Sequence, residues 1–205
     1  MVIHGNGWIG PDPELIRKPA NAEMWHHQGW AIMIPEFQAG ASGLEDLVAH
    51  HDDLRRRYPR TPICLFGYSA GAHLALMLAV RRPDVRCVIS EAGPTDLRAL
   101  STTDPVNVYP LAVRAFGEGN LAEWSPIRFA DKIHASVFQV AARNDPVVPA
   151  SQAELLAPKL RSGRLRILDP GEAGFIHSKV DAGQWKRARA EELSFLASFE
   201  DPTLG

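Results

Sequence analysis

The sequence of 205 residues lacks the features that mark several classes of protein. It has two cysteines, too few for the disulfide framework that holds many small secreted domains together. Its longest apolar runs hold about five to eight residues, whereas a helix that crosses a bilayer needs roughly 20. The N-terminus shows no charged segment followed by an apolar stretch. We therefore expect no secretory signal, no membrane partner and a cytoplasmic location.

An excess of positive charge is also missing. Lys and Arg number 22 against 24 Asp and Glu, a formal net charge of −2, so no nucleic-acid partner is expected. Metal-ligand spacings such as C-x-x-C and H-E-x-x-H are absent, and we expect neither a metal nor another cofactor. Cys64 and Cys87 each lie inside an apolar run, which favours buried free thiols.

What the sequence contains is typical of one globular domain spanning 1–205. Hydrophobic residues make up 45% and charged residues 22%. Short apolar runs alternate with amphipathic stretches, which predicts an α/β fold: a three-layer α/β/α sandwich with a mainly parallel sheet of about six strands. The predicted strands are Val2–His4, Trp30–Pro35, Ile63–Phe66, Val85–Ser90, Ser136–Ala142 and Leu165–Leu168. The predicted helices are Leu44–Tyr58, Ala70–Arg82, Gln152–Leu160 and Gln184–Phe199.

One segment, 95–130, differs from the rest of the chain. It holds three of the 16 prolines and has no dominant hydrophobic period. Such a long irregular segment in a compact domain is more typical of a lid or cap over a site than of a connecting loop.

The strongest motif is Gly67-Tyr68-Ser69-Ala70-Gly71, between a predicted strand and a predicted helix. This is the context of the G-x-S-x-G nucleophile elbow, in which a tight turn exposes a serine hydroxyl. The glycines on either side of Ser69 allow the strained turn. The alternative is a serine in an ordinary turn between a strand and a helix.

A serine nucleophile needs a base and an acid that orients the base, and elbow enzymes carry them in the order Ser, acid, His. Asp145 follows the predicted strand Ser136–Ala142, and the only histidine beyond it is His177. The sequence therefore predicts Asp145 and His177 as the acid and the base. Asp96, which follows the strand Val85–Ser90, is the rival for the acid.

The segment His4-Gly5-Asn6-Gly7-Trp8 ends the first predicted strand. A glycine-rich turn exposes backbone N–H groups, so Gly5, Asn6 and Gly7, together with Ala70, are candidates for an oxyanion hole. We expect His4 to anchor this turn. Trp8 and Tyr68 are candidates for the substrate pocket, with core packing the alternative for Trp8.

Two further patterns favour structural explanations. Gly5-x-Gly7-x-x-Gly10 matches the dinucleotide-binding fingerprint, but Pro11 and Pro13 follow where a helix would have to begin. We therefore expect no nucleotide. His73, one helical turn after Ser69, is expected to pack or to brace a loop.

Together HGNGW, GYSAG, NDPVVP and the late histidine resemble the α/β-hydrolase superfamily, in particular its esterase/lipase and prolyl-oligopeptidase-like branches. The resemblance implies a triad of Ser69, His177 and Asp145 and an oxyanion hole from the HGNG turn and Ala70. Two features depart from the pattern. Asn6 replaces a glycine, and two strands that usually precede the oxyanion turn are not in the sequence. A shortened sheet would leave Trp30–Pro35 as an exposed edge, for which a second copy of the chain is a candidate partner.

Three functions are weighed. The first is hydrolysis of small to medium carboxylic esters through an acyl-enzyme, with a small-molecule ester as substrate. The second is amide hydrolysis, since SAGAHLA resembles the elbow of arylformamidases; a peptidase is less favoured, because the peptidases of the resembled branch carry a propeller domain. The third is ligand binding without catalysis, against which all three triad positions are filled.

Overall fold

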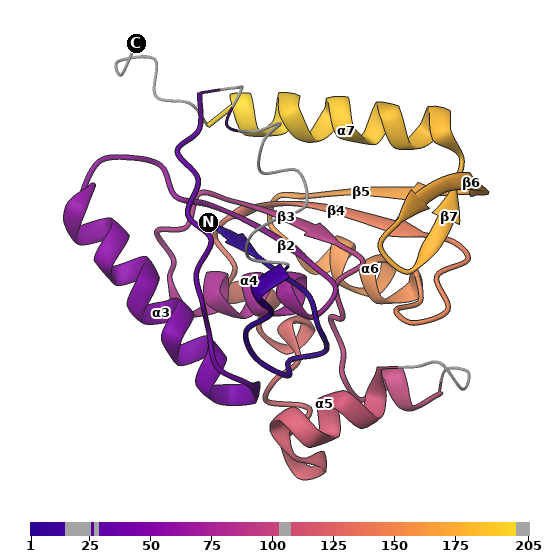
Figure 1. Cartoon of the computed structure of the whole chain (residues 1–205), viewed down its shortest axis with the longest axis horizontal. Helices are drawn as coiled ribbons and strands as arrows, with labels where there is room; N and C mark the ends of the chain where they lie inside the picture. The colour runs from indigo at the N-terminus through magenta and orange to yellow at the C-terminus, as the bar shows by residue number, and fades with distance from the viewer. Residues whose placement is uncertain (15–25, 27–28, 103–107, 200–205) are drawn as a thin grey trace.

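The computed structural model describes residues 1–14, 26, 29–102 and 108–199 (Figure 1). Five strands form one sheet in the order β1-β2-β3-β4-β5, and every neighbouring pair is parallel. The strands are β1 (Val2–Ile3), β2 (Cys64–Tyr68), β3 (Cys87–Glu91), β4 (Ser136–Ala142) and β5 (Gly163–Leu168). The α/β class and the mainly parallel sheet predicted from the sequence are confirmed, with five strands in place of about six.

Helices cover both faces of this sheet (Figure 1). The C-terminal helix α7 (Ala182–Ala197) lies on one face, and its first turn is capped by Asp181, which accepts the N–H of Gln184 at 2.7 Å. The opposite face carries α3 (Gly40–Arg57), α4 (Ala70–Arg81) and α6 (Ser151–Leu156). All residues from Ala70 to Ala79 are buried, as the apolar sequence of α4 predicts.

In its described residues, the segment 95–130 forms short helical elements and no strand. It contains α5 (Tyr109–Phe116) and the 3₁₀ turns η1 (Ala99–Thr102), η2 (Glu118–Asn120) and η3 (Pro126–Lys132). A further 3₁₀ turn, η4 (Ala157–Lys159), completes the predicted helix Gln152–Leu160. The prediction that 95–130 is a lid concerns its function and stays a prediction; residues 103–107 lie outside the described part.

The predicted strand Trp30–Pro35 is wrong. The segment runs beside β1, and the N–H of Val2 donates to the carbonyl of Met33 at 2.8 Å, but it forms no strand of the sheet. Trp30, Ile32 and Ile34 are half-buried against the apolar cluster beneath α7. Their apolar character therefore serves packing of an irregular segment rather than pairing in the sheet.

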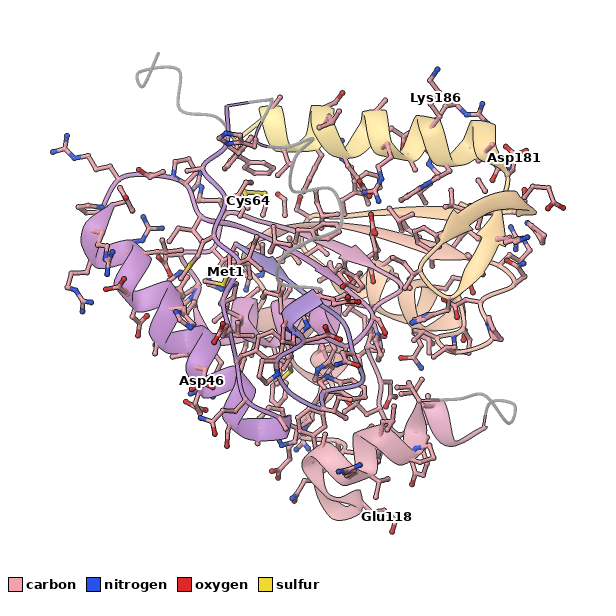
Figure 2. All side chains as sticks on the ribbon, in the orientation of Figure 1. Met1, Asp46, Cys64, Glu118, Asp181 and Lys186 are labelled. Atoms are coloured by element: carbon pink, nitrogen blue, oxygen red, sulfur yellow. A yellow bond between two sulfur atoms is a disulfide. The ribbon has the colours of Figure 1, made fainter. Side chains whose placement is uncertain are left out.

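The prediction of two free thiols is also wrong, because Cys64 and Cys87 form a disulfide. The two residues are direct partners on β2 and β3, and their Cα atoms are 4.6 Å apart. Figure 2 shows Cys64 beneath the C-terminal end of α7. Both residues are buried as predicted, but the strand register that pairs them is not readable from the spacing of 23 residues.

An antiparallel hairpin, β6 (Pro170–Phe175) and β7 (Ser178–Val180), stands apart from the main sheet (Figure 1). The sequence did not predict it. Within the described part of the chain, no helix is long and apolar enough to cross a membrane.

Candidate active site

Ser69 lies at the turn between β2 and α4. Its backbone has φ 53° and ψ −127°, and its N–H donates to the carbonyl of Glu91 at 2.8 Å. A Cβ at Gly71 would overlap the carbonyl oxygens of Ile3 and His4, and one at Gly67 would overlap the backbone of Gly71. The turn can therefore form only with glycine at these two positions, as the motif predicts.

His177 lies in the turn of the β6–β7 hairpin and faces the serine. Its Nε2 is 3.0 Å from Oγ of Ser69, and its Nδ1 is 3.0 Å from Oδ2 of Asp145. The carboxylate accepts the Nδ1–H, which leaves Nε2 free to accept the serine proton. The structure thus brings together the three residues that the sequence predicts as nucleophile, base and acid.

Asp145 follows β4, and its side chain is fully buried. Its Oδ1 accepts the backbone N–H groups of Val147 at 2.8 Å and Val148 at 2.9 Å. These bonds fix the carboxylate so that Oδ2 faces the imidazole. Neither donor was predicted from the sequence, although an aspartate that starts a turn commonly accepts the N–H two residues on.

The rival acid, Asp96, is engaged elsewhere. Its Oδ1 accepts the backbone N–H of Arg98 at 3.1 Å. Its own N–H and that of Thr95 donate to the side chain of Gln152, at 2.8 and 2.7 Å. No hydrogen bond joins Asp96 to His177 in the described part of the chain, so the geometry favours Asp145.

The glycine turn after β1 has an unusual backbone. Asn6 has φ 97°, Gly7 has φ 56° and Trp8 has φ 59°. Because Gly71 packs directly on the carbonyls of Ile3 and His4, this turn lies beside the first turn of α4. N–H groups at the start of a helix have no acceptor one turn back, so those of Ala70 and Gly71 are donors at this place, whereas that of Ala72 donates to the carbonyl of Ser69 at 3.0 Å.

Two buried histidines brace the turn through hydrogen bonds. The Nδ1–H of His4 donates to the carbonyl of Gly5 at 2.8 Å, and its ring stacks on Phe37 at 4.5 Å. His73 accepts the indole N–H of Trp8 at 3.1 Å and donates to the carbonyl of Trp124 at 2.6 Å. Burial lowers the pKa of His73 to about 4 and that of His4 below its ordinary value. Both bracing roles are as the sequence predicts.

The two candidates for the substrate pocket differ in exposure. Trp8 is 2% exposed and lies in the core, which supports its packing alternative. Tyr68 is half-buried, and its ring lies within 2.8 Å of the position of a Cβ on Gly5. Burial raises the pKa of the Tyr68 hydroxyl. Leu111 of α5 packs against Gly7, so the 95–130 segment reaches the glycine turn.

Comparisons with known proteins identify the family. The profile of the prolyl oligopeptidase family matches residues 23–197, most of the chain. The chain belongs to this family. Members of the prolyl oligopeptidase family are serine hydrolases with the α/β-hydrolase fold. A comparison with curated proteins gives no match.

Solved structures of esterases, lipases and peptidases resemble this member of the prolyl oligopeptidase family. A carboxyl esterase from the fungus Tuber melanosporum superposes with a TM-score of 0.74 at 16% identity, over 97% of this chain and 76% of the other. A monoacylglycerol lipase from Paleococcus ferrophilus gives 0.64 at 16% identity, over 97% and 93%. At such identities the likeness shows the fold alone.

A peptidase from Mycobacterium tuberculosis that hydrolyses puromycin is 25% identical, with a TM-score of 0.65. The match covers 76% of this chain but 25% of the peptidase, so the chain spans about a quarter of that relative's length.

Proposed function

We propose that the chain hydrolyses small to medium carboxylic esters through an acyl-enzyme. The observation that carries the proposal is the hydrogen-bonded series from Ser69 Oγ through His177 to the buried carboxylate of Asp145. A serine hydroxyl is a weak nucleophile unless an adjacent base takes its proton, and that base needs a third group to orient it. Each of these requirements has a side chain in place.

In the proposed reaction Ser69 Oγ attacks the ester carbonyl while His177 Nε2 takes its proton. The N–H of Ala70 and those of the turn Gly5, Asn6 and Gly7 stabilise the oxyanion. The C–O bond to the alcohol then breaks, and the imidazolium gives its proton to the leaving oxygen. A water molecule, deprotonated by His177, releases the acid and restores the serine. Asp145 stays ionised and stabilises the imidazolium.

The second candidate is hydrolysis of an amide or peptide bond. It is favoured by the family and by the 25% identical peptidase, which hydrolyses puromycin. The same serine, histidine and aspartate would act on either bond, since His177 can protonate a leaving nitrogen as well as an oxygen. The size and polarity of the leaving group decide between the two.

A series of p-nitrophenyl esters from acetate to decanoate, run beside aminoacyl and peptidyl p-nitroanilides, tests the proposal. We expect ester turnover with a maximum at one acyl length, lost by several orders of magnitude in Ser69→Ala. Turnover of the anilides alone would replace the ester proposal by the amide one. No turnover of either class by folded protein would leave ligand binding as the function.

Two other expectations stay predictions. The cytoplasmic location is opposed by the Cys64–Cys87 disulfide, since disulfides are rare in that compartment; alkylating the thiols of intact cells before lysis tests it. A homodimer was expected from an exposed edge at Trp30–Pro35, which is not a strand here. A monomeric mass by light scattering at micromolar concentration would count against the dimer.

A further inference from the structure

Three ionisable side chains lie together beneath α7, on the face of the sheet opposite α4. Arg189 of α7 donates from Nη1 to Glu91 Oε1 at 2.5 Å and to Glu192 Oε2 at 2.6 Å. The side chains of Glu91 and Glu192 are fully buried, and that of Arg189 is 17% exposed. One oxygen of each acid receives no hydrogen bond from the described residues. A buried ionic cluster adds little stability compared with apolar residues of the same size. Stability alone therefore does not explain why these three residues are buried together.

The cluster is linked through β3 to the serine turn, which is the turn at Ser69 between β2 and α4. Glu91 is the last residue of β3 and pairs with Tyr68, the residue before Ser69. Its backbone carbonyl accepts the Ser69 N–H, while its side chain is held by Arg189. The strained backbone of Ser69 is therefore hydrogen-bonded to Glu91, and the side chain of Glu91 is in turn bound by Arg189 of α7.

Arg189 is also linked, through two aromatic rings, to the histidine turn, which consists of Ile176 and His177 between β6 and β7. The guanidinium carbon of Arg189 lies 3.9 Å from the ring centroid of Trp185, a cation–π contact. Trp185 packs edge-on against Phe175 with ring centroids 4.8 Å apart. Phe175 ends β6, two residues before His177.

We propose that Arg189 is a positioning residue that holds the serine turn and the histidine turn of the site in register. Residues in sparsely populated backbone regions persist only where their surroundings hold them, and both turns contain one: Ser69 with φ 53° and Ile176 with φ 43°. The 3.0 Å contact between Ser69 Oγ and His177 Nε2 depends on both. This inference rests on the proposed function, because a displacement of about 1 Å in a catalytic group costs roughly 100-fold in rate.

The test is a variant in which the cluster is neutral and keeps its volume: Glu91→Gln, Arg189→Met and Glu192→Gln together. We expect it to melt near the wild type and to lose about ten- to 100-fold in kcat on p-nitrophenyl acetate with KM within about twofold. The low-field proton resonance of the His177–Asp145 hydrogen bond should broaden or vanish. Arg187→Met, at an exposed arginine on the same helix, is the matched control and should keep all three values.

A folded triple variant with wild-type kcat and an unchanged low-field resonance would overturn the proposal and make the cluster purely structural. If the triple variant does not fold, Arg189→Lys supplies the decision, since lysine keeps a cation near the acids but loses the planar stack on Trp185. We expect a smaller fall in kcat and a weakened resonance; unchanged values would overturn the proposal. If the wild type turns over no substrate, the proposed function fails, and the resonance still decides the role of Arg189.

Discussion

Residues with a strained, positive-φ backbone are concentrated in the segments that form the candidate active site. In the described part of the chain five residues other than glycine have positive φ: Asn6, Trp8, Ser69, Ala92 and Ile176. They lie in the glycine turn, at the elbow, after β3 and beside His177, and such conformations cost about 1–3 kcal/mol each. The sequence marks the elbow, because its flanking glycines form a pattern. It does not mark Ala92 or Ile176, since neither lies in such a motif.

The choice of acid gives a prediction at the scale of single residues. Asp145→Asn keeps the shape of the side chain but removes the charge that orients His177 and stabilises the imidazolium. We expect kcat to fall roughly 10³- to 10⁴-fold on the best p-nitrophenyl ester. Asp96→Asn is the matched control and should stay within about threefold, because that carboxylate binds a backbone N–H instead of the imidazole. A larger loss in Asp96→Asn than in Asp145→Asn would reverse the assignment.

A second prediction concerns the buried acid Glu192. Burial and the neighbouring Glu91 raise the pKa of its carboxyl well above the ordinary 4.5. As pH rises past that value the unfolded chain releases this proton while the folded chain keeps it, so the free energy of unfolding falls. Glu192→Gln should therefore melt at a few degrees higher than the wild type at pH 8 and nearly equal to it at pH 4.

Thermal unfolding between pH 4 and pH 8 checks this expectation. Glu191→Gln is the control, since Glu191 lies at the surface and pairs with Arg166 at 2.7 Å. Melting curves of Glu192→Gln and the wild type that stay parallel over the whole range would show that Glu192 does not hold a proton in the folded protein.

At the scale of elements, the sequence predicts correctly those helices and strands that contain a long hydrophobic period or a continuous apolar run. The strand Ser136–Ala142 is found with the predicted bounds, and the helix predicted over Ala70–Arg82 differs by one residue. The hairpin carrying His177 was missed because Pro170–Phe175 holds one large apolar side chain and two glycines, which gives no alternation. The chain order still identifies the histidine, because no other histidine follows Asp145.

The packing of α4 against the glycine turn gives a prediction at this scale. Gly71→Ala would drive a Cβ into the carbonyls of Ile3 and His4, so the helix and the turn must separate. We expect a loss of several kcal/mol in the free energy of unfolding by urea, or failure to fold. Gly119→Ala, where a Cβ meets nothing within 4 Å, should remain within about 0.5 kcal/mol of the wild type. Equal stability of the two variants would refute this account of the elbow.

At the scale of the whole molecule, the disulfide joins the central strand β3 to its neighbour β2. It joins residues 23 apart in sequence, and closing a loop of that size stabilises a protein by about 3 kcal/mol. We expect reductant to lower the urea midpoint of the wild type and to leave that of the double variant Cys64→Ala/Cys87→Ala unchanged. A wild-type midpoint insensitive to reductant, with two thiols titrated under denaturing conditions without it, would show that the bond does not form.

The central claim is that Ser69 is a nucleophile activated by His177. The most direct measurement is to treat the folded protein with an active-site-directed fluorophosphonate and locate the adduct by peptide mass spectrometry. The account predicts one adduct, on the peptide that contains Ser69, absent in Ser69→Ala and formed much more slowly in His177→Ala. No adduct on the folded wild type, or an adduct on another residue, would contradict it.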